Sequence, residues 1–265
     1  MIKIAHVSDL HFHKKAEDNE KALSLLDRIK GAYDFAHDEA YLLATGDIVD
    51  DGEISQYNNA LTALKPFEEH LLVAPGNHDY GFGGNIFSHD SALLFDNEFL
   101  PNLGINFRFM QKQPMVRLLD DGAGTKLLTV GLNSVLETST VLDFARGGIG
   151  KQQLSDLNTI LSNPGYADIP KFVYLHHRPQ KCIWFLEMVD AEDFMAVMNQ
   201  NNVSVVAFGH SGGTMRPEEP PQARIMNIIK KEYGVKYLLN ANSSVDAQKY
   251  YEIVVDNGEV SVSIK

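Results

Sequence analysis

Short apolar runs alternate with amphipathic segments along most of the chain. Apolar runs rich in β-branched residues predict strands at residues 2–9, 40–47, 70–79, 114–121, 125–134, 171–179, 203–210, 223–229, 235–241 and 250–264. Apolar residues near helical spacing predict helices at residues 17–32, 54–67, 150–162 and 190–201. Because strand-then-helix units repeat in the first part of the chain, we expect right-handed crossovers and a largely parallel sheet there.

The last third of the chain differs, because its predicted strands follow one another without helices. The pair Asn257-Gly258 is typical of a tight hairpin turn, so we expect an antiparallel finish. Residues 80–100 and 215–222 are expected to form loops that determine specificity. We find no repeat, low-complexity segment or linker, and therefore predict a single domain over residues 1–265.

The composition narrows the class of protein. Hydrophobic residues make up 44% and charged residues 22%, as in ordinary globular proteins. The net charge of -12 argues against a surface for long nucleic acid, although bound cations could still hold a small anionic substrate. Cys182 is the only cysteine, which excludes an intrachain disulfide and favours a reducing, cytoplasmic location. No apolar run is long enough for a spanning helix, so we expect no membrane association.

Five of the predicted strands end in Asp, Asn or His. These residues are Asp9, His11, Asp47, Asp50, Asn77, His78, Asp79, His176, His177 and His210. Taken singly, each is more often a turn, cap or core residue than a ligand. In open α/β sheets, however, ligands bind at the carboxyl ends of strands, and so many buried polar groups are costly unless something pairs them. Divalent metal ions would do so, and these ligand types suit Mn, Fe or Zn.

The motifs "DLH", "GDIVD", "GNHD", "LHH" and "GHSG" occur in this order along the chain. They resemble the D-x-H, G-D-x-x-D, G-N-H-D, H and G-H-x-H motifs of the calcineurin-like metallophosphoesterases. Gly212 stands where this family has the last histidine. The segments "GLNS" and "GGIGKQQLSDL" are also similar to those of many phosphodiesterases in the family. The resemblance implies a four-layer α/β/β/α sandwich of two mixed sheets, with the metal site at the carboxyl ends of the strands.

The resemblance also implies roles for individual residues. A first metal would take Asp9 and His11, a second would take Asn77, His176 and His210, and Asp47 would bridge the two. His177 remains an alternative to His176. His78 would face the leaving group, with Asp50 as the partner that orients it. Substrate contacts would come from Asn77, His78 and Arg178, although Arg178 could instead be solvated, and Asp79 could be a supporting carboxylate or a turn cap.

These roles predict hydrolysis of a small phosphodiester, such as a cyclic nucleotide, or of a phosphomonoester by a metal-activated water. Protein phosphatase-like activity is an alternative. A weakened enzyme that acts as a nucleotide-binding sensor is another, because glycine at position 212 cannot ligate and would leave the first metal site weak.

Overall fold

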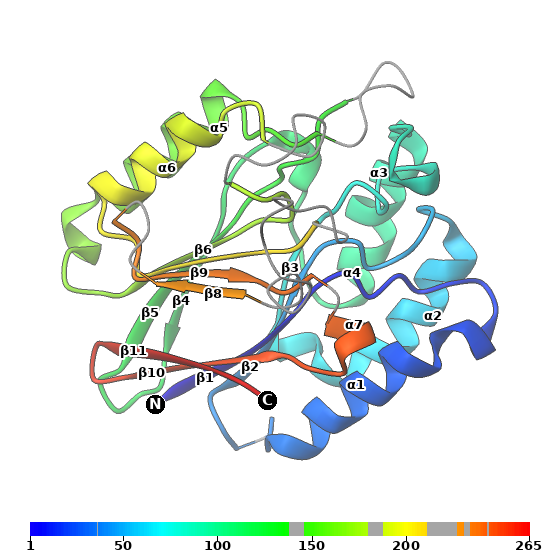
Figure 1. Cartoon of the computed structure of the whole chain (residues 1–265), viewed down its shortest axis with the longest axis horizontal. Coiled ribbons are helices and arrows are strands. Elements are labelled where there is room, and N and C mark those ends of the chain that lie inside the picture. The colour runs from blue at the N-terminus through cyan, green and yellow to red at the C-terminus, as the bar shows by residue number, and fades with distance from the viewer. Residues whose placement is uncertain (36, 138–145, 180–187, 211–226, 231–233, 243) are drawn as a thin grey trace, which may run out of the picture.

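The computed structural model describes the chain apart from residues 36, 138–145, 180–187, 211–226, 231–233 and 243. Two β-sheets face each other, and helices cover their outer faces (Figure 1). Helices α1 (Glu20–Ala32) and α2 (Ile54–Leu64) lie on one outer side, and α5 (Lys151–Leu161) and α6 (Ala191–Gln200) lie on the other. The expected four-layer α/β/β/α sandwich is confirmed.

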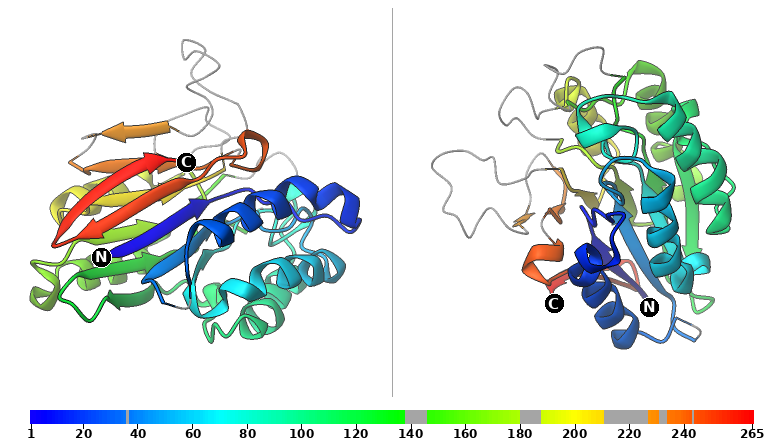
Figure 2. Two further views of the ribbon diagram at one scale, coloured as in Figure 1. Left: turned by 90° about the horizontal axis from the view of Figure 1, so that it is seen from below. Right: turned by 90° about the vertical axis from the view of Figure 1, so that its right-hand side faces the viewer.

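The first sheet has the strand order β11-β10-β1-β2-β3. Its strands are β1 (Ile2–Val7), β2 (Ala40–Thr45), β3 (Leu71–Ala74), β10 (Tyr251–Asp256) and β11 (Glu259–Ile264). The pairs β1–β2 and β2–β3 are parallel, while β10 pairs antiparallel with both β1 and β11. The predicted parallel start and antiparallel finish therefore belong to one mixed sheet, and both chain ends lie in it (Figure 2).

The second sheet has the order β4-β5-β6-β7-β9-β8. Its strands are β4 (Met115–Asp120), β5 (Lys126–Gly131), β6 (Lys171–Tyr174), β7 (Val205–Phe208), β8 (Asn227–Lys230) and β9 (Tyr237–Asn240). The strands β5, β6, β7 and β9 pair in parallel, whereas β4 and β8 are antiparallel edges. The second sheet is therefore mixed as well.

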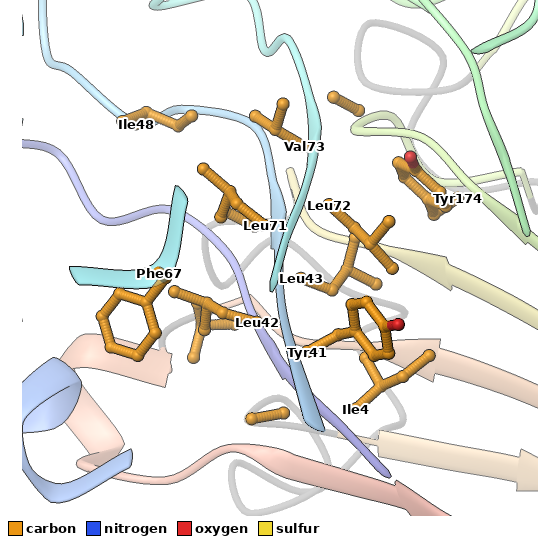
Figure 3. Packing of buried hydrophobic residues seen from close by; sticks show 14 of the residues in the cluster. Ile4, Tyr41, Leu42, Leu43, Ile48, Phe67, Leu71, Leu72, Val73 and Tyr174 are labelled. Atoms are coloured by element: carbon orange, nitrogen blue, oxygen red, sulfur yellow. The ribbon is translucent and has the colours of Figure 1, made fainter. Parts of the chain in front are cut away.

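Side-chain alternation divides the core into layers. In β6, Phe172 and Tyr174 belong to the cluster shared with the first sheet, whereas Val173 packs with the residues under α5 and α6. Figure 3 shows the same alternation in β2, where Leu42 lies beside Phe67 and Leu43 points to the opposite side. Because both faces of these strands are buried, their sequences are continuous apolar runs.

The segment that we expected to be a loop at residues 80–100 is largely helical from His89 onward. Helix α3 (His89–Leu94) continues through a π-helical turn (Phe95–Phe99) into α4 (Leu100–Asn102). The Ser88 hydroxyl caps the start by accepting the Ser91 N–H. A short helix α7 (Ser244–Ala247) was also not predicted. No helix in the described part of the chain has both the length and the apolar character to cross a membrane.

Candidate metal centre

The polar strand ends of the two sheets come together at one place. The described residues contain three groups whose potential ligand atoms lie within 4.8 Å of one another. These groups are Asp9, His11 and Asp47; Asp47, His176 and His210; and His11, Asp50 and His78. They draw on the ends of β1, β2 and β3 in the first sheet and of β6 and β7 in the second. The site therefore lies where the carboxyl ends of parallel strands from both sheets meet.

Asp47 occupies the centre of this cluster. Its Oδ2 lies 3.1 Å from Nε2 of His176 and 3.9 Å from Nε2 of His11. Its Oδ1 accepts the backbone N–H of His78 at 3.0 Å. One carboxylate therefore faces histidines from both sheets, which is the arrangement that a bridging ligand requires.

The hydrogen bond made by Nδ1 of His176 prepares the other ring nitrogen for ligation. Nδ1 lies 2.7 Å from the backbone oxygen of Thr45, which can only accept, so Nδ1 carries the proton. Nε2 then faces Asp47 and His210, whose Nδ1 is 3.1 Å away, and would become a ligand once a metal ion displaces its proton. The neighbouring His177 instead places its Nδ1 against the Ser134 hydroxyl, 2.8 Å away. The geometry therefore favours His176 over His177 as a ligand.

Among the described residues, two buried oxygen atoms at the site have no hydrogen-bond partner. They are Oδ2 of Asp9 and Oδ1 of Asn77. The Asn77 amide group donates its Nδ2–H to the backbone oxygen of Gly84 at 3.1 Å, which leaves Oδ1 directed elsewhere. A buried acceptor without a partner costs ~1–3 kcal/mol. A cation would offset this cost, so the donor set fits a divalent metal.

The backbone is strained at four of the predicted ligands. Asp9, His11, Asp47 and His210 have φ values of 56°, 44°, 49° and 58°, in the left-handed region that non-glycine residues rarely adopt. Such conformations cost ~1–3 kcal/mol each and concentrate at functional sites. Nothing in the apolar pattern of the sequence indicated this strain.

Gly76 and Gly209 allow the chain to approach the site closely. A Cβ atom on Gly76 would collide with the Asp47 carboxylate, and one on Gly209 would collide with Ser8 and Asp9. The first glycine of the "GNHD" motif and that of the "GHSG" motif are therefore explained by the lack of space next to the predicted ligands.

Charge coupling perturbs the ionisation of the whole cluster. Burial alone would lower the pKa of His176, but the Asp47 carboxylate outweighs it and raises the pKa to about 9. Burial would also lower the pKa of His11, but the Asp50 and Asp47 carboxylates stabilise its charged form and raise the pKa to about 9. The pKa of Asp47 is held well below its ordinary value against burial, chiefly by His176, while burial raises the pKa of Asp9. A binding metal ion would therefore displace protons from these histidines.

Asp50 makes different contacts from those expected. Its carboxylate lies 3.2 Å from Nδ1 of His11 and 3.4 Å from Nδ1 of His13. Nδ1 of His78 donates instead to the backbone oxygen of Asp50 at 2.7 Å, and the carboxylate is 3.8 Å away. Asp50 thus holds His78 through its main chain, while its side chain supports His11. His13, which flanks the first motif two residues after His11, also reaches this carboxylate.

Asp79 joins the loops that follow β2 and β3. Its Oδ1 accepts the backbone N–H groups of Ile48 and Val49 at 2.9 and 3.0 Å, and its Oδ2 accepts that of Gly76 at 2.8 Å. Burial raises the pKa of this carboxyl to about 7, and the nearby Asp47 adds to the shift. The sequence left Asp79 as a supporting carboxylate or a turn cap. The observed contacts with both ligand-bearing loops are those of a supporting carboxylate.

The remaining predicted residues are placed only in part. Arg178 is buried, two residues beyond His176, so the alternative of a solvated side chain is wrong. Gly212 and the predicted loop at residues 215–222 lie outside the described residues. The missing histidine therefore stays a prediction from sequence.

The family model for calcineurin-like phosphoesterases matches residues 2–212. The chain therefore belongs to this family of metal-dependent phosphoric ester hydrolases, as its motifs predicted. A solved structure of TT1561 from Thermus thermophilus has the same overall fold, with a TM-score of 0.53 at 11% identity over 99% of this chain and 98% of that chain.

Two curated relatives are phosphodiesterases. The chain is 29% identical to the glycerophosphodiester phosphodiesterase GpdQ of Enterobacter lignolyticus over 66% of its own length, and this match spans 56% of the relative. It is 25% identical to a probable cyclic nucleotide phosphodiesterase of Coxiella burnetii, CBUA0032, over 79% of its own length and 75% of the relative.

Proposed function

We propose that the protein is a metal-dependent phosphoesterase that hydrolyses a small phosphodiester. The observation that carries this proposal is the convergence of Asp9, His11, Asp47, His176 and His210 at the ends of strands from both sheets. Similarity to two phosphodiesterases supports a diester rather than a monoester, with a cyclic nucleotide or a glycerophosphodiester as the leading candidates. The acidic net charge of -12 suits a small substrate better than a nucleic acid polymer.

The proposed ligands divide into two sets that share Asp47. Asp9 and His11 would hold the first divalent ion, and Asn77, His176 and His210 would hold the second. Manganese, iron and zinc all suit these oxygen and nitrogen ligands. When bound, the two ions would acidify a water molecule and neutralise the phosphoryl oxygens.

His78 is the proposed proton donor to the leaving group. Its Nδ1–H is occupied by the backbone oxygen of Asp50, 2.7 Å away, which fixes the orientation of the ring. The side chain is only partly buried, and Gly84 lies beside its Nε2, where a Cβ atom would collide with the ring. Asn77 and the buried Arg178 would contribute to substrate binding beside it.

A direct test compares the purified protein with Asp47→Ala and Asn77→Ala variants in the presence of Mn²⁺. Model diesters, cyclic nucleotides, glycerophosphodiesters and model monoesters are offered in parallel. We expect the wild-type protein to prefer diesters and both variants to lose at least ~10²-fold in kcat/KM, because each removes a ligand. Activity that survives both changes contradicts the proposed site.

The alternative of a nucleotide-binding sensor rests on Gly212. A weak first site would leave one tightly held ion per chain, and metal content measured after purification distinguishes the two functions. Two ions with turnover support the enzyme, whereas one ion with nucleotide affinity and no turnover supports the sensor. We also retain the single domain over residues 1–265 and a cytoplasmic location as proposals; the latter rests on the lone cysteine.

A further inference from the structure

Ser134, in the "GLNS" segment after β5, contacts His177 twice. Its hydroxyl oxygen accepts the backbone N–H of His177 at 3.1 Å and lies 2.8 Å from Nδ1 of the same residue. Both side chains are fully buried. The proposed ligand set assigns no role to either residue.

These two contacts hold the His177 ring through Nδ1. The Ser134 hydroxyl can donate to Nδ1 or accept from it, because a hydroxyl has one proton and two lone pairs. In either tautomer the contact of 2.8 Å joins Nδ1 to the segment that carries Ser134, while Nε2 of the ring has no hydrogen-bond partner among the described residues. The hydroxyl therefore restricts the rotation of the ring.

The His177 ring packs against both histidines proposed for the second metal. Its centroid is 4.2 Å from that of His210 at an interplanar angle of 47°, and 5.0 Å from that of His176 at 85°. On another side of the ring lies Gly147, where a Cβ atom would collide with it. The ring is thus confined between Gly147 and the two candidate ligands.

The segment around Ser134 is itself held by the polar side chain of Gln153, on α5. Gln153 accepts the backbone N–H of Asn133 at 3.1 Å and donates to its backbone oxygen at 2.9 Å. Lys112 donates to the backbone oxygen of Val135 on the other side of Ser134. The "GLNS" and "GKQQL" segments therefore form one buried hydrogen-bonded unit behind the His177 ring.

We propose that Ser134 and His177 are a positioning pair for the second metal site, which act by holding the His176 and His210 rings in place. This inference rests on the proposed function, because it needs those two histidines to be ligands. Supporting residues of this kind typically change metal affinity about 10–100-fold when they are removed.

The test measures Mn²⁺ stoichiometry and affinity by titration of the metal-stripped protein, without substrate. We expect Ser134→Ala to weaken one of the two Mn²⁺ ions about 10–100-fold. Ser134→Thr, which keeps the hydroxyl, should retain more of the affinity. Thr129→Val is the matched control, because it removes another buried hydroxyl, one that donates to the backbone oxygen of Arg117 on β4.

Unchanged Mn²⁺ affinity in Ser134→Ala overturns the inference, even if the protein loses stability as Thr129→Val does. Should Ser134→Ala fail to fold, Ser134→Cys, which keeps only a weak donor of similar size, is titrated instead. Mn²⁺ affinity below that of Ser134→Thr supports the inference, and affinity equal to that of the wild type overturns it. Asp47→Ala distinguishes a failure of this inference from a failure of the proposed function. If Asp47→Ala keeps both ions, the proposed function is wrong. If Asp47→Ala loses metal and Ser134→Ala does not, only the positioning pair is wrong.

Discussion

The carboxylate of Asp50 lies 3.2 Å from Nδ1 of His11, while Nε2 of the same ring faces Asp47 at 3.9 Å. A carboxylate on one ring nitrogen holds the ring and makes the other nitrogen a better ligand. Asp50 also accepts from His78, but through its backbone oxygen, which no side-chain substitution removes. The contacts therefore separate the effect of Asp50 on His11 from its effect on His78.

Asp50→Ala should weaken the first metal ion about 10–100-fold, because His11 loses the carboxylate that orients it. Mn²⁺ titration of the stripped variant measures this loss. Asp50→Asn keeps an oxygen that can accept from Nδ1, so it should retain more of the affinity. If Asp50→Ala keeps its metal affinity and loses activity only on substrates with poor leaving groups, the Asp50 side chain acts on His78 instead.

Metal binding should stabilise the folded protein. A ligand at about 100 times its dissociation constant adds ~2.7 kcal/mol to the free energy of unfolding, since the unfolded chain has no assembled site. Addition of Mn²⁺ to stripped protein should therefore raise the midpoint of thermal unfolding. In Asp47→Ala, which lacks the shared ligand, the same addition should change the midpoint much less. Equal shifts in both proteins would mean that the ion binds elsewhere.

Asp96 gives the stability a pH dependence outside the metal centre. Its carboxylate accepts the backbone N–H groups of Phe109 and Met110 at 3.1 and 2.8 Å, yet burial raises its pKa to about 6. The folded protein therefore holds this proton more tightly than the unfolded chain, and its contribution to stability is lost as the pH rises from about 4 to about 6.

The corresponding experiment measures the free energy of unfolding of metal-stripped wild type and Asp96→Asn between about pH 4 and about pH 7, a range that spans the raised pKa of about 6. The difference in the free energy of unfolding between wild type and Asp96→Asn should change as the pH rises toward this pKa and should level off above it. Asp90→Asn, an exposed carboxylate on α3, is the control and should track the wild type. A constant difference for Asp96→Asn would contradict the raised pKa.

Gly212→His should tighten the first metal ion and raise phosphoesterase activity, because it supplies the histidine that the family motif has at this position. Gly213→His, one residue further along, is the matched control and should do neither. If Gly212→His changes neither the metal stoichiometry nor the rate, the alignment of this motif is wrong.

The strand ends were predictable because their polar residues interrupt continuous apolar runs. Asp9, Asp47 and His210 each follow a run that forms a buried strand, so the sheet edge could be located before the structure was known. Strand lengths were overestimated, as at residues 70–79, because β3 (Leu71–Ala74) stops at Pro75 and the rest is the ligand-bearing loop.

Contacts between distant segments were not predictable. Asp190 precedes α6 but does not cap this helix with its side chain; its carboxylate accepts the backbone N–H groups of Ile149 and Gly150 instead. Only the packing of α5 beside α6 brings these groups within reach. The helical segment from His89 to Asn102 did carry a signal, since Ala92, Phe95 and Phe99 recur at helical spacing and are buried.

The hydrogen bond from His176 to the Thr45 oxygen joins residues 131 positions apart, one from each sheet. The proton on Nδ1 of His176 is therefore placed only once the two sheets have docked. A partly folded chain with one formed sheet would lack this bond and the metal ligands that the other sheet supplies. Metal binding should then leave the folding rate nearly unchanged and slow unfolding instead, so that the ion contributes to the lifetime of the native state.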